Sequence, residues 1–519
     1  MSSPSKGAPA LAPFEFLRWI WRQLTSMRTA LILLFMLAIA SIPGSLIPQE
    51  RVDPSAVFAF RRRHPGLAPV FDRIGMFDVY SSAWFSAIYL LLFVSLLGCI
   101  VPRLRAYLRS VRARPPKAPS NLARLSAYDS WRSDAPVGDE VERARATLRG
   151  QRRRVEVYQS DPGTVVSAEK GYVREAGNLV FHVAVLVVLV GFAVTGLFGY
   201  KGSAAVVAGQ GFSNTLTQYD EFTPGARFGA DSLSPFSFTV KRFHATYETS
   251  GVGAGTPLSF DADLSVTPSP GAPPYDFDLR VNHPLQVGGV SVFLIGHGYA
   301  PNITVRDGDG NVAFSGPAIF LPQDGSFTSF GVVKAPDARP AQLGLEGYFF
   351  PSAALGPNRT PYSSFPAPRN PVLSLVAYHG DLGLDDGAPQ SVYVLDKDRL
   401  KPFTMDNGKP EPLLLRKGQT IKLAQGMGSV TFNGLRTWVK LQINHQPGKV
   451  IPLVGVLAAI GGLLCSLFIR PRRTWVRVSD DHGRTVVEVA ALDRVSGGDP
   501  GGHVERVATA LRPTEEERE

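Results

Sequence analysis

Four uninterrupted apolar blocks constrain this sequence of 519 residues more than any other feature. None of them contains Asp, Glu, Lys or Arg. Each is long enough to cross a hydrocarbon core of about 30 Å as a helix that rises about 1.5 Å per residue. We therefore expect membrane-spanning helices at residues 29–47, 83–101, 176–198 and 450–469. The first block is longer than the apolar part of a signal peptide, and no clear cleavage site follows it, so we interpret it as a retained span.

The formal net charge is +10, and many of the basic residues flank the spans on one side. The basic residues that flank them include Arg28, Arg103, Arg174 and Arg470. Cytoplasmic loops carry an excess of Lys and Arg, so this pattern places both termini and the loop 102–175 in the cytoplasm. The cluster at 61–63 argues the other way, but the four consistent flanks outweigh it. We expect no nucleic-acid partner, because no basic platform interleaved with aromatic residues is present.

The spans divide the chain into further segments of distinct character. In order, these are a cytoplasmic lead (1–28), an outer loop (48–82), a cytoplasmic α/β loop (102–175), an extracytoplasmic β-rich domain (199–449) and a cytoplasmic C-terminal segment (470–519). The fold class that we expect is therefore membrane α + β, with four transmembrane helices. A large all-β domain lies between spans three and four, and the cytoplasmic α/β segments are small.

Short alternating runs bounded by Gly and Pro predict a β-sandwich or an open sheet in the large segment. The clearest runs are 236–247, 288–301, 372–380, 390–396 and 428–444. Alternation also predicts strands in both cytoplasmic pieces, including a hairpin around His482-Gly483. Our hypothesis is that the loop 102–175 and the segment 470–519 pack together into one inner domain.

His182 is the one ionisable histidine inside an apolar block. It lies about six residues from the inner end of span three, so roughly 9 Å deep. Ionisable residues at this depth usually face a helix-bundle interior or a cavity, and imidazole is a common axial ligand of haem iron. An interhelical hydrogen bond, worth about 0.6–2 kcal/mol, explains the residue equally well. Both interpretations stay open at this point.

The chain has two cysteines, Cys99 and Cys465, and both lie in spans at the same inner-leaflet depth as His182. A CxxC redox role of this chain is therefore excluded. The three side chains are candidates for a cluster that holds a metal or haem, with Cys99 the better of the two thiols. The alternative is that each cysteine is a small apolar residue in a buried helix. The remaining outer histidines match no zinc template, so we expect ordinary strand or turn residues.

Four stretches, in order along the chain, resemble the ResB family. They are LTSMRTALILLFMLAIASIPGSLIPQ (24–49), FDVYSSAWFSAIYLLLFVSLLGCIVPR (77–103), REAGNLVFHVAVLVVLVGF (174–192) and residues 430–476, which begin VTFNGLRTWVKLQINHQPGKV. The outer stretch VNHPLQVGGVSVFL (281–294) is also similar. Each motif alone is weak, but the ordered set with four spans and a large outer segment is specific.

The resemblance implies a haem-handling role in the assembly of cytochrome c. A partner membrane protein of ResC or CcsA type would join this chain, and the pair would deliver haem b across the membrane and support its attachment to the CxxCH thiols of apocytochrome c. This chain would be a non-catalytic or co-catalytic subunit, and no catalytic residue is expected in it. The resemblance makes His182 the position of a haem-iron ligand, and a cysteine tied to haem in some members makes Cys99 a further candidate.

Haem chemistry agrees with this implication, because basic residues at the inner interface, such as Arg103 or Arg174, are placed to meet its propionates. With one membrane histidine, the isolated chain is expected to bind haem weakly. The alternative from another class is a membrane scaffold or sensor that displays a β domain and binds no haem.

Overall fold

A computed structural model describes residues 13–50, 54–356, 360–387, 390–493 and 497–512. The start of the expected lead and the end of the expected C-terminal segment lie outside these ranges. Contacts divide the chain into two compact units. Ala193–Lys449 forms one unit, and the chain before and after it forms the other.

The first unit contains four helices that are long and apolar enough to cross a membrane. They are α2 (Met27–Leu46), α5 (Ala83–Arg112), α7 (Tyr172–Phe198) and α8 (Val450–Phe468). Large apolar side chains such as Phe35, Leu457 and Phe468 are exposed on them. A helix that is hydrophobic all round and exposed is suited to lipid. The chain is thus a membrane protein with four apolar helices, and α5 continues past Val101 as a cationic extension.

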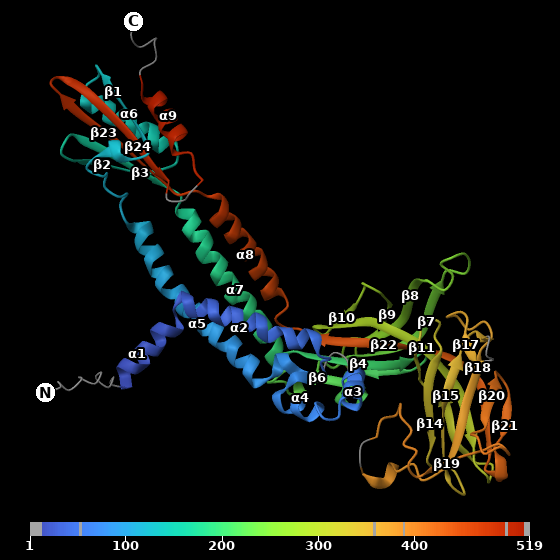
Figure 1. Ribbon diagram of the computed structural model, residues 1–519. Helices are drawn as coiled ribbons and strands as arrows, with labels where there is room; N and C mark the ends of the chain where they lie inside the picture. The colour runs from blue at the N-terminus through green and yellow to red at the C-terminus, as the bar shows by residue number, and fades with distance from the viewer. Residues whose placement is uncertain (1–12, 51–53, 357–359, 388–389, 494–496, 513–519) are drawn as a thin grey trace, which may run out of the picture. The chain divides into compact units, whose positions relative to one another are not determined.

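Glycines bring α7 and α8 into close contact, and the two helices run side by side in Figure 1. A Cβ atom on Gly177 would lie 2.6 Å from the carbonyl oxygen of Gly462, and a Cβ on Gly462 would lie 2.6 Å from that of Gly177. Gly455 approaches the backbone of α7 in the same way. Small residues at such contacts let two backbones approach and gain van der Waals contact where no hydrophobic driving force exists.

Shorter helices lie near the ends of the spans. They are α1 (Pro13–Leu24), α3 (Pro54–Arg63), α4 (Ala68–Ile74) and the 3₁₀ helix η1 (Met76–Ser81). Arg61 pairs with Glu50 at 3.2 Å and with Asp72 at 2.9 Å, which ties α3 to α4 and to the end of α2. This pairing neutralises one of the three arginines that run against the charge pattern of the flanks.

A small α/β domain completes the first unit. Its elements are η2 (Leu122–Arg124), β1 (Ala127–Ser133), α6 (Val137–Gly150), β2 (Arg154–Gln159), β3 (Thr164–Lys170), β23 (Arg472–Asp481), β24 (Arg484–Asp493) and α9 (Pro500–Leu511). The strands form one antiparallel sheet in the order β1-β24-β23-β3-β2. Helices α6 and α9 cover one face, where Leu148 and Leu511 join a core with the sheet (Figure 1). The hypothesis that the two chain pieces form one domain is confirmed.

This domain is joined to α7 and α8 with almost no linker. Strand β3 ends at Lys170 and α7 begins at Tyr172, while α8 ends at Phe468 and β23 begins at Arg472. Strands β3 and β23 are also direct neighbours, with Ala168 opposite Thr474. The start of α7 and the end of α8 therefore meet at the same edge of one small domain.

The second unit is β-rich, as expected, and beyond the last residues of α7 its described residues contain only 3₁₀ turns as helix. The turns are η3 (Leu216–Gln218), η4 (Ala230–Ser232), η5 (Leu384–Asp386) and η6 (Ala424–Gly426). Two long strands, β11 (Val290–Arg306) and β22 (Ser429–His445), pair antiparallel along their whole length. Their two halves contribute to different hydrophobic cores, one containing Ile443 and the other Phe432.

The other strands of this unit are placed around that central pair. The first group is β4 (Tyr200–Val207), β5 (Gly211–Ser213), β6 (Glu221–Pro224), β7 (Ser237–Tyr247), β8 (Pro257–Thr267), β9 (Tyr275–Arg280), β10 (Leu285–Val287), β12 (Val312–Pro317) and β13 (Phe320–Pro322). The second group is β14 (Ser329–Ala335), β15 (Gln342–Phe350), β16 (Ala353–Leu355), β17 (Pro361–Ser363), β18 (Val372–Gly380), β19 (Leu400–Pro402), β20 (Pro412–Arg416) and β21 (Thr420–Lys422). A thirteen-stranded sheet has the main order β19-β18-β15-β14-β13-β11-β22-β4-β6, and its other four strands pair beside this path: β10 and β12 with β11, β20 with β18, and β21 with β22. A four-stranded sheet follows β5-β7-β8-β9, and β16 pairs with β17.

One strand expected from the sequence is wrong. Residues 390–396 alternate like a strand but form a turn and irregular backbone. Val392 and Val394 are 68% and 61% exposed, so the alternation does not face a core. Alternation predicts a strand only where one face is buried against a neighbour. The other clear runs correspond to β7, β11, β18 and β22.

Candidate ligand-binding site

His182 lies on α7, and its Nδ1 atom is 2.7 Å from the carbonyl oxygen of Asn178. A carbonyl oxygen only accepts, so Nδ1 carries the proton and donates it. In the neutral form of this ring the second nitrogen, Nε2, keeps its lone pair and can bind a metal. The same hydrogen bond holds the ring in one orientation, as partners of metal-binding histidines do. Asn178 is therefore the residue that sets the tautomer of His182.

An apolar pocket of about 430 Å³ opens among α2, α5 and α7. Its walls include Leu34, Leu96, Phe181 and Val185, together with His182 and Cys99. The volume falls within the range of about 300–1,000 Å³ that small-molecule and cofactor sites occupy. The pocket therefore suits a largely apolar ligand, with one imidazole at its wall.

A second pocket of about 630 Å³ lies between α5, the start of α7 and the small α/β domain. Its cationic residues are Arg103, Arg114, Lys170, Arg174 and Arg473, and its acidic residues are Glu169 and Glu175. His182 and Arg103 line both pockets, so the apolar and charged pockets adjoin at these two side chains. The combined site offers an apolar region at one end and a cationic region at the other.

Cys99 shares the apolar pocket with His182, and its thiol also has a structural contact. Its Sγ donates a hydrogen bond to the carbonyl oxygen of Thr25 at 3.0 Å. One turn earlier, Ser95 donates to the carbonyl oxygen of Leu24 at 2.6 Å. Both bonds fasten the corner between α1 and α2 to α5. As a donor, Cys99 is a neutral thiol in this arrangement, because a thiolate has no proton to give.

Cys465 does not join the other two residues. A Cβ atom on Gly177 would lie 2.7 Å from the Cβ of Cys465, which places this cysteine in the contact between α7 and α8. It lines neither pocket. Within the described ranges, no group of three or more His, Cys, Asp or Glu is arranged to hold a metal ion. The structure therefore brings only two of the three candidates together, because equal depth in a membrane does not place residues on facing sides of their helices.

The outer histidines have ordinary partners where the structure records them. His297 is buried among Phe243, Phe260 and Phe327, with ring centroids at 4.8, 4.7 and 4.5 Å. Burial lowers the pKa of His297 to about 4, so it packs as a neutral ring. His283 contacts the carbonyl oxygen of Asp278, and His445 contacts that of Gly289.

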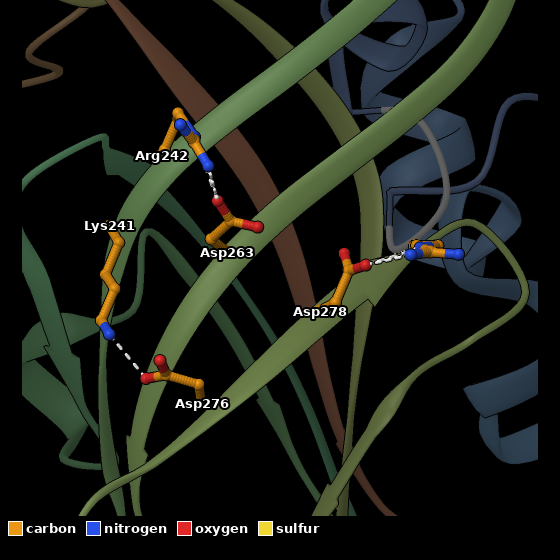
Figure 2. A network of polar contacts seen from close by, with 6 residues as sticks. Lys241, Arg242, Asp263, Asp276 and Asp278 are labelled. Atoms are coloured by element: carbon orange, nitrogen blue, oxygen red, sulfur yellow. Dashed lines mark hydrogen bonds and ion pairs between the residues drawn. The ribbon is translucent and has the colours of Figure 1, made fainter.

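The outer face of β7, β8 and β9 is strongly charged, but its charges are paired with one another. Figure 2 shows Lys241 directed toward Asp276 and Arg242 toward Asp263, at 2.6 and 2.8 Å. Asp278 pairs with Arg280 on the same strand. Such exposed pairs contribute about 0–1 kcal/mol each. The charged side chains of this face therefore neutralise one another. The two pockets beside His182 are the better candidates for a ligand-binding site.

Asn178 and Met27 are site residues that sequence reasoning missed. Asn178 was visible as the one amide residue in its apolar block, four positions before His182. Residues four apart lie on the same helix face, so this spacing is the signal that would have paired them. Met27, at the start of α2, carries no comparable signal.

Four apolar helices and a β-rich unit define a multi-pass membrane protein, and an apolar and a charged pocket adjoin at one imidazole among its helices. The model of the ResB-like family matches residues 27–501, and the chain belongs to this family.

Curated relatives point the same way. The chain is 29% identical over 287 residues to a protein of Thermosynechococcus vestitus named cytochrome c biogenesis protein CcsB, over 53% of this chain and 60% of that relative. It is 27% identical over 284 residues to a protein of the same name from Gloeobacter violaceus, over 52% of this chain and 54% of the relative. The chain thus spans less than two thirds of the length of these relatives.

Proposed function

We propose that this chain is a subunit of cytochrome c biogenesis that handles haem as cargo. Together with a membrane protein of ResC or CcsA type, it delivers haem across the membrane and supports its covalent attachment to apocytochrome c. The family match and the names of the curated relatives support the biological role. The observation that carries the chemistry is His182, which lines both the apolar and the charged pocket and whose Nδ1 is bonded to a backbone carbonyl, which leaves Nε2 for a ligand.

The donor set fits haem as a ligand. Haem is planar and largely apolar, it carries two propionates, and its iron accepts imidazole as an axial ligand. The apolar pocket supplies covering surface, and His182 supplies the imidazole. Cys99 contacts the cargo as a neutral thiol in the same wall. Because the spans contain one histidine, a second strong axial ligand comes from the partner.

The location follows from the charge pattern. We place the chain in the bacterial cell membrane, with both termini and the small α/β domain in the cytoplasm and the β-rich unit outside it. The flanking arginines support this orientation. The single sheet that joins β3 before α7 to β23 after α8 supports a common side for both pieces.

The test is the haem spectrum of the complex. The chain is co-expressed with its ResC-type partner and purified with and without His182→Ala. A matched control is His482→Ala, because the His482 side chain is 99% exposed at a hairpin tip. We expect the Soret band to fall or shift in His182→Ala alone, with the complex intact.

Two other outcomes contradict the proposal. An unchanged Soret band returns His182 to a packing role and leaves the partner as the haem-binding subunit. An intact complex without haem in any variant favours the membrane scaffold or sensor, which displays the β-rich unit and binds no haem.

A further inference from the structure

Arg103 is the residue at which three membrane helices meet. It extends from α5, and its Nη1 lies 3.4 Å from the side-chain oxygen of Asn178 on α7. Its Nη2 lies 3.1 Å from the sulfur of Met27 on α2. Both partners are uncharged. The guanidinium therefore holds a position at the junction of the two pockets without being neutralised there.

Of the four other cations of the charged pocket, two are paired with carboxylates and a third bonds a backbone carbonyl. Arg473 pairs with Glu169 at 3.0 Å, and Arg114 pairs with Glu156 at 3.1 Å. Arg174 donates its Nε to the carbonyl oxygen of Ser466. In the part of the chain that the structure describes, no carboxylate lies within ion-pair distance of Arg103. Arg103 is also the one cation that lines the apolar pocket.

Asn178 connects this cation to His182. Its backbone carbonyl accepts from the Nδ1 of His182, and its side-chain oxygen accepts from Arg103. One residue of α7 thus orients both an imidazole and a guanidinium at the same junction. A ligand that meets both groups needs an electron-pair acceptor and an anionic group on one apolar body.

We infer that Arg103 is a specificity-determining residue that binds a carboxylate of a planar, apolar ligand whose body fills the apolar pocket. Arginine presents a rigid fork of donors that matches a carboxylate in two-pronged geometry. This inference rests on the proposed function, since the ligand it describes in that setting is haem held through its propionate. It goes beyond that function by naming Arg103 as the residue that distinguishes a ligand with a free carboxylate from the corresponding ester.

The test compares two probes that differ only in this group: haem and its dimethyl ester. The full-length chain in lipid nanodiscs is titrated with each probe, and the dissociation constant is read from the Soret difference spectrum. Charge-assisted hydrogen bonds predict that the wild type prefers haem over the ester by roughly tenfold or more. Arg103→Gln is expected to abolish this preference by weakening haem alone, and Arg103→Lys to keep part of it.

Two controls separate position from charge. Arg105→Gln removes a cation from the same helix that lines neither pocket, and Lys170→Gln removes one that lines only the charged pocket. Both are expected to keep the preference. Equal weakening of both probes in Arg103→Gln, or loss of the preference in Lys170→Gln instead, overturns the inference while leaving His182-dependent binding intact. A chain that binds neither probe, or binds them independently of His182, contradicts the proposed function itself.

Discussion

His182 donates its Nδ1 proton to the carbonyl oxygen of Asn178 across 2.7 Å, so one helical turn of α7 decides which ring nitrogen carries the proton. The backbone of α7 thereby does for this histidine what a carboxylate partner often does for metal-binding histidines. The arrangement needs no acidic residue inside the membrane, where an ionised carboxylate is costly.

The isolated chain is expected to bind haem weakly and with one strong axial ligand, because one membrane histidine is present. Titration of the purified lone subunit, followed by absorption spectroscopy, should show a low-affinity, five-coordinate species. Adding the partner should convert it to a tight six-coordinate one. A tight six-coordinate haem in the lone subunit would contradict this expectation.

Cys99→Ser is expected to leave the position of the Soret band unchanged. Serine keeps a donor toward the carbonyl oxygen of Thr25, and a neutral thiol makes no bond to iron that the change would remove. Cys99→Ala should lower stability by about 1 kcal/mol through the lost hydrogen bond. Absorption spectra and unfolding curves of both variants check this, and a Soret shift in Cys99→Ser would identify a thiolate ligand instead.

Gly462→Ala is expected to force α7 and α8 apart. Its added Cβ would lie 2.6 Å from the carbonyl oxygen of Gly177 and 2.7 Å from the backbone nitrogen of Phe181. Overpacking of this kind costs about 1–3 kcal/mol. The neighbouring Gly461 has no atom within 4 Å of such a Cβ, so Gly461→Ala is the matched control. Reversible unfolding in bicelles measures both, and equal stability of the two variants would refute the close contact.

The small α/β domain is expected to lose stability as the pH falls from about 6.5 toward 4. Burial, reinforced by the positive charges of Arg153, Arg472 and Arg506, lowers the pKa of His503 to about 4. In the unfolded chain the pKa returns to about 6.5, so the unfolded state binds more protons in this window. Folding is therefore favoured above it and weakened below, by on the order of 2–3 kcal/mol.

Hydrogen exchange of β23 and β24, read by mass spectrometry at several pH values, tests this dependence. His503→Gln should flatten it, whereas the same change at the exposed His482 should not. Carboxylates titrate alike in both variants, so the difference between them isolates His503. Parallel curves for His503→Gln and the wild type would show that this histidine does not govern the effect.

The sequence predicted those features that depend on local periodicity. Long apolar blocks gave the four helices, and alternation beside buried neighbours gave strands such as β11 and β22. The run at 390–396 failed because its alternating valines face solvent. The sequence did not predict the pockets, because they depend on which sides of α2, α5 and α7 face one another. Depth in the membrane, which the sequence does give, grouped His182 with Cys99 and also with Cys465. The structure places Cys465 against Gly177 of α7, away from the pocket that the other two line.

The sheet of the small domain is built from two distant pieces of the chain, so it can be completed only after the second piece has been synthesised. Strand β24 lies between β1 and β23, and β23 lies against β3, so the middle of the sheet is made last. Until α8 has entered the membrane and β23 has returned, β1 and β3 keep open edges and the apolar side of α6 lacks α9. Open edges invite pairing with other chains. Closure of this sheet therefore requires that the start of α7 and the end of α8 lie on the same side, so the small domain becomes complete only after the last span has been made.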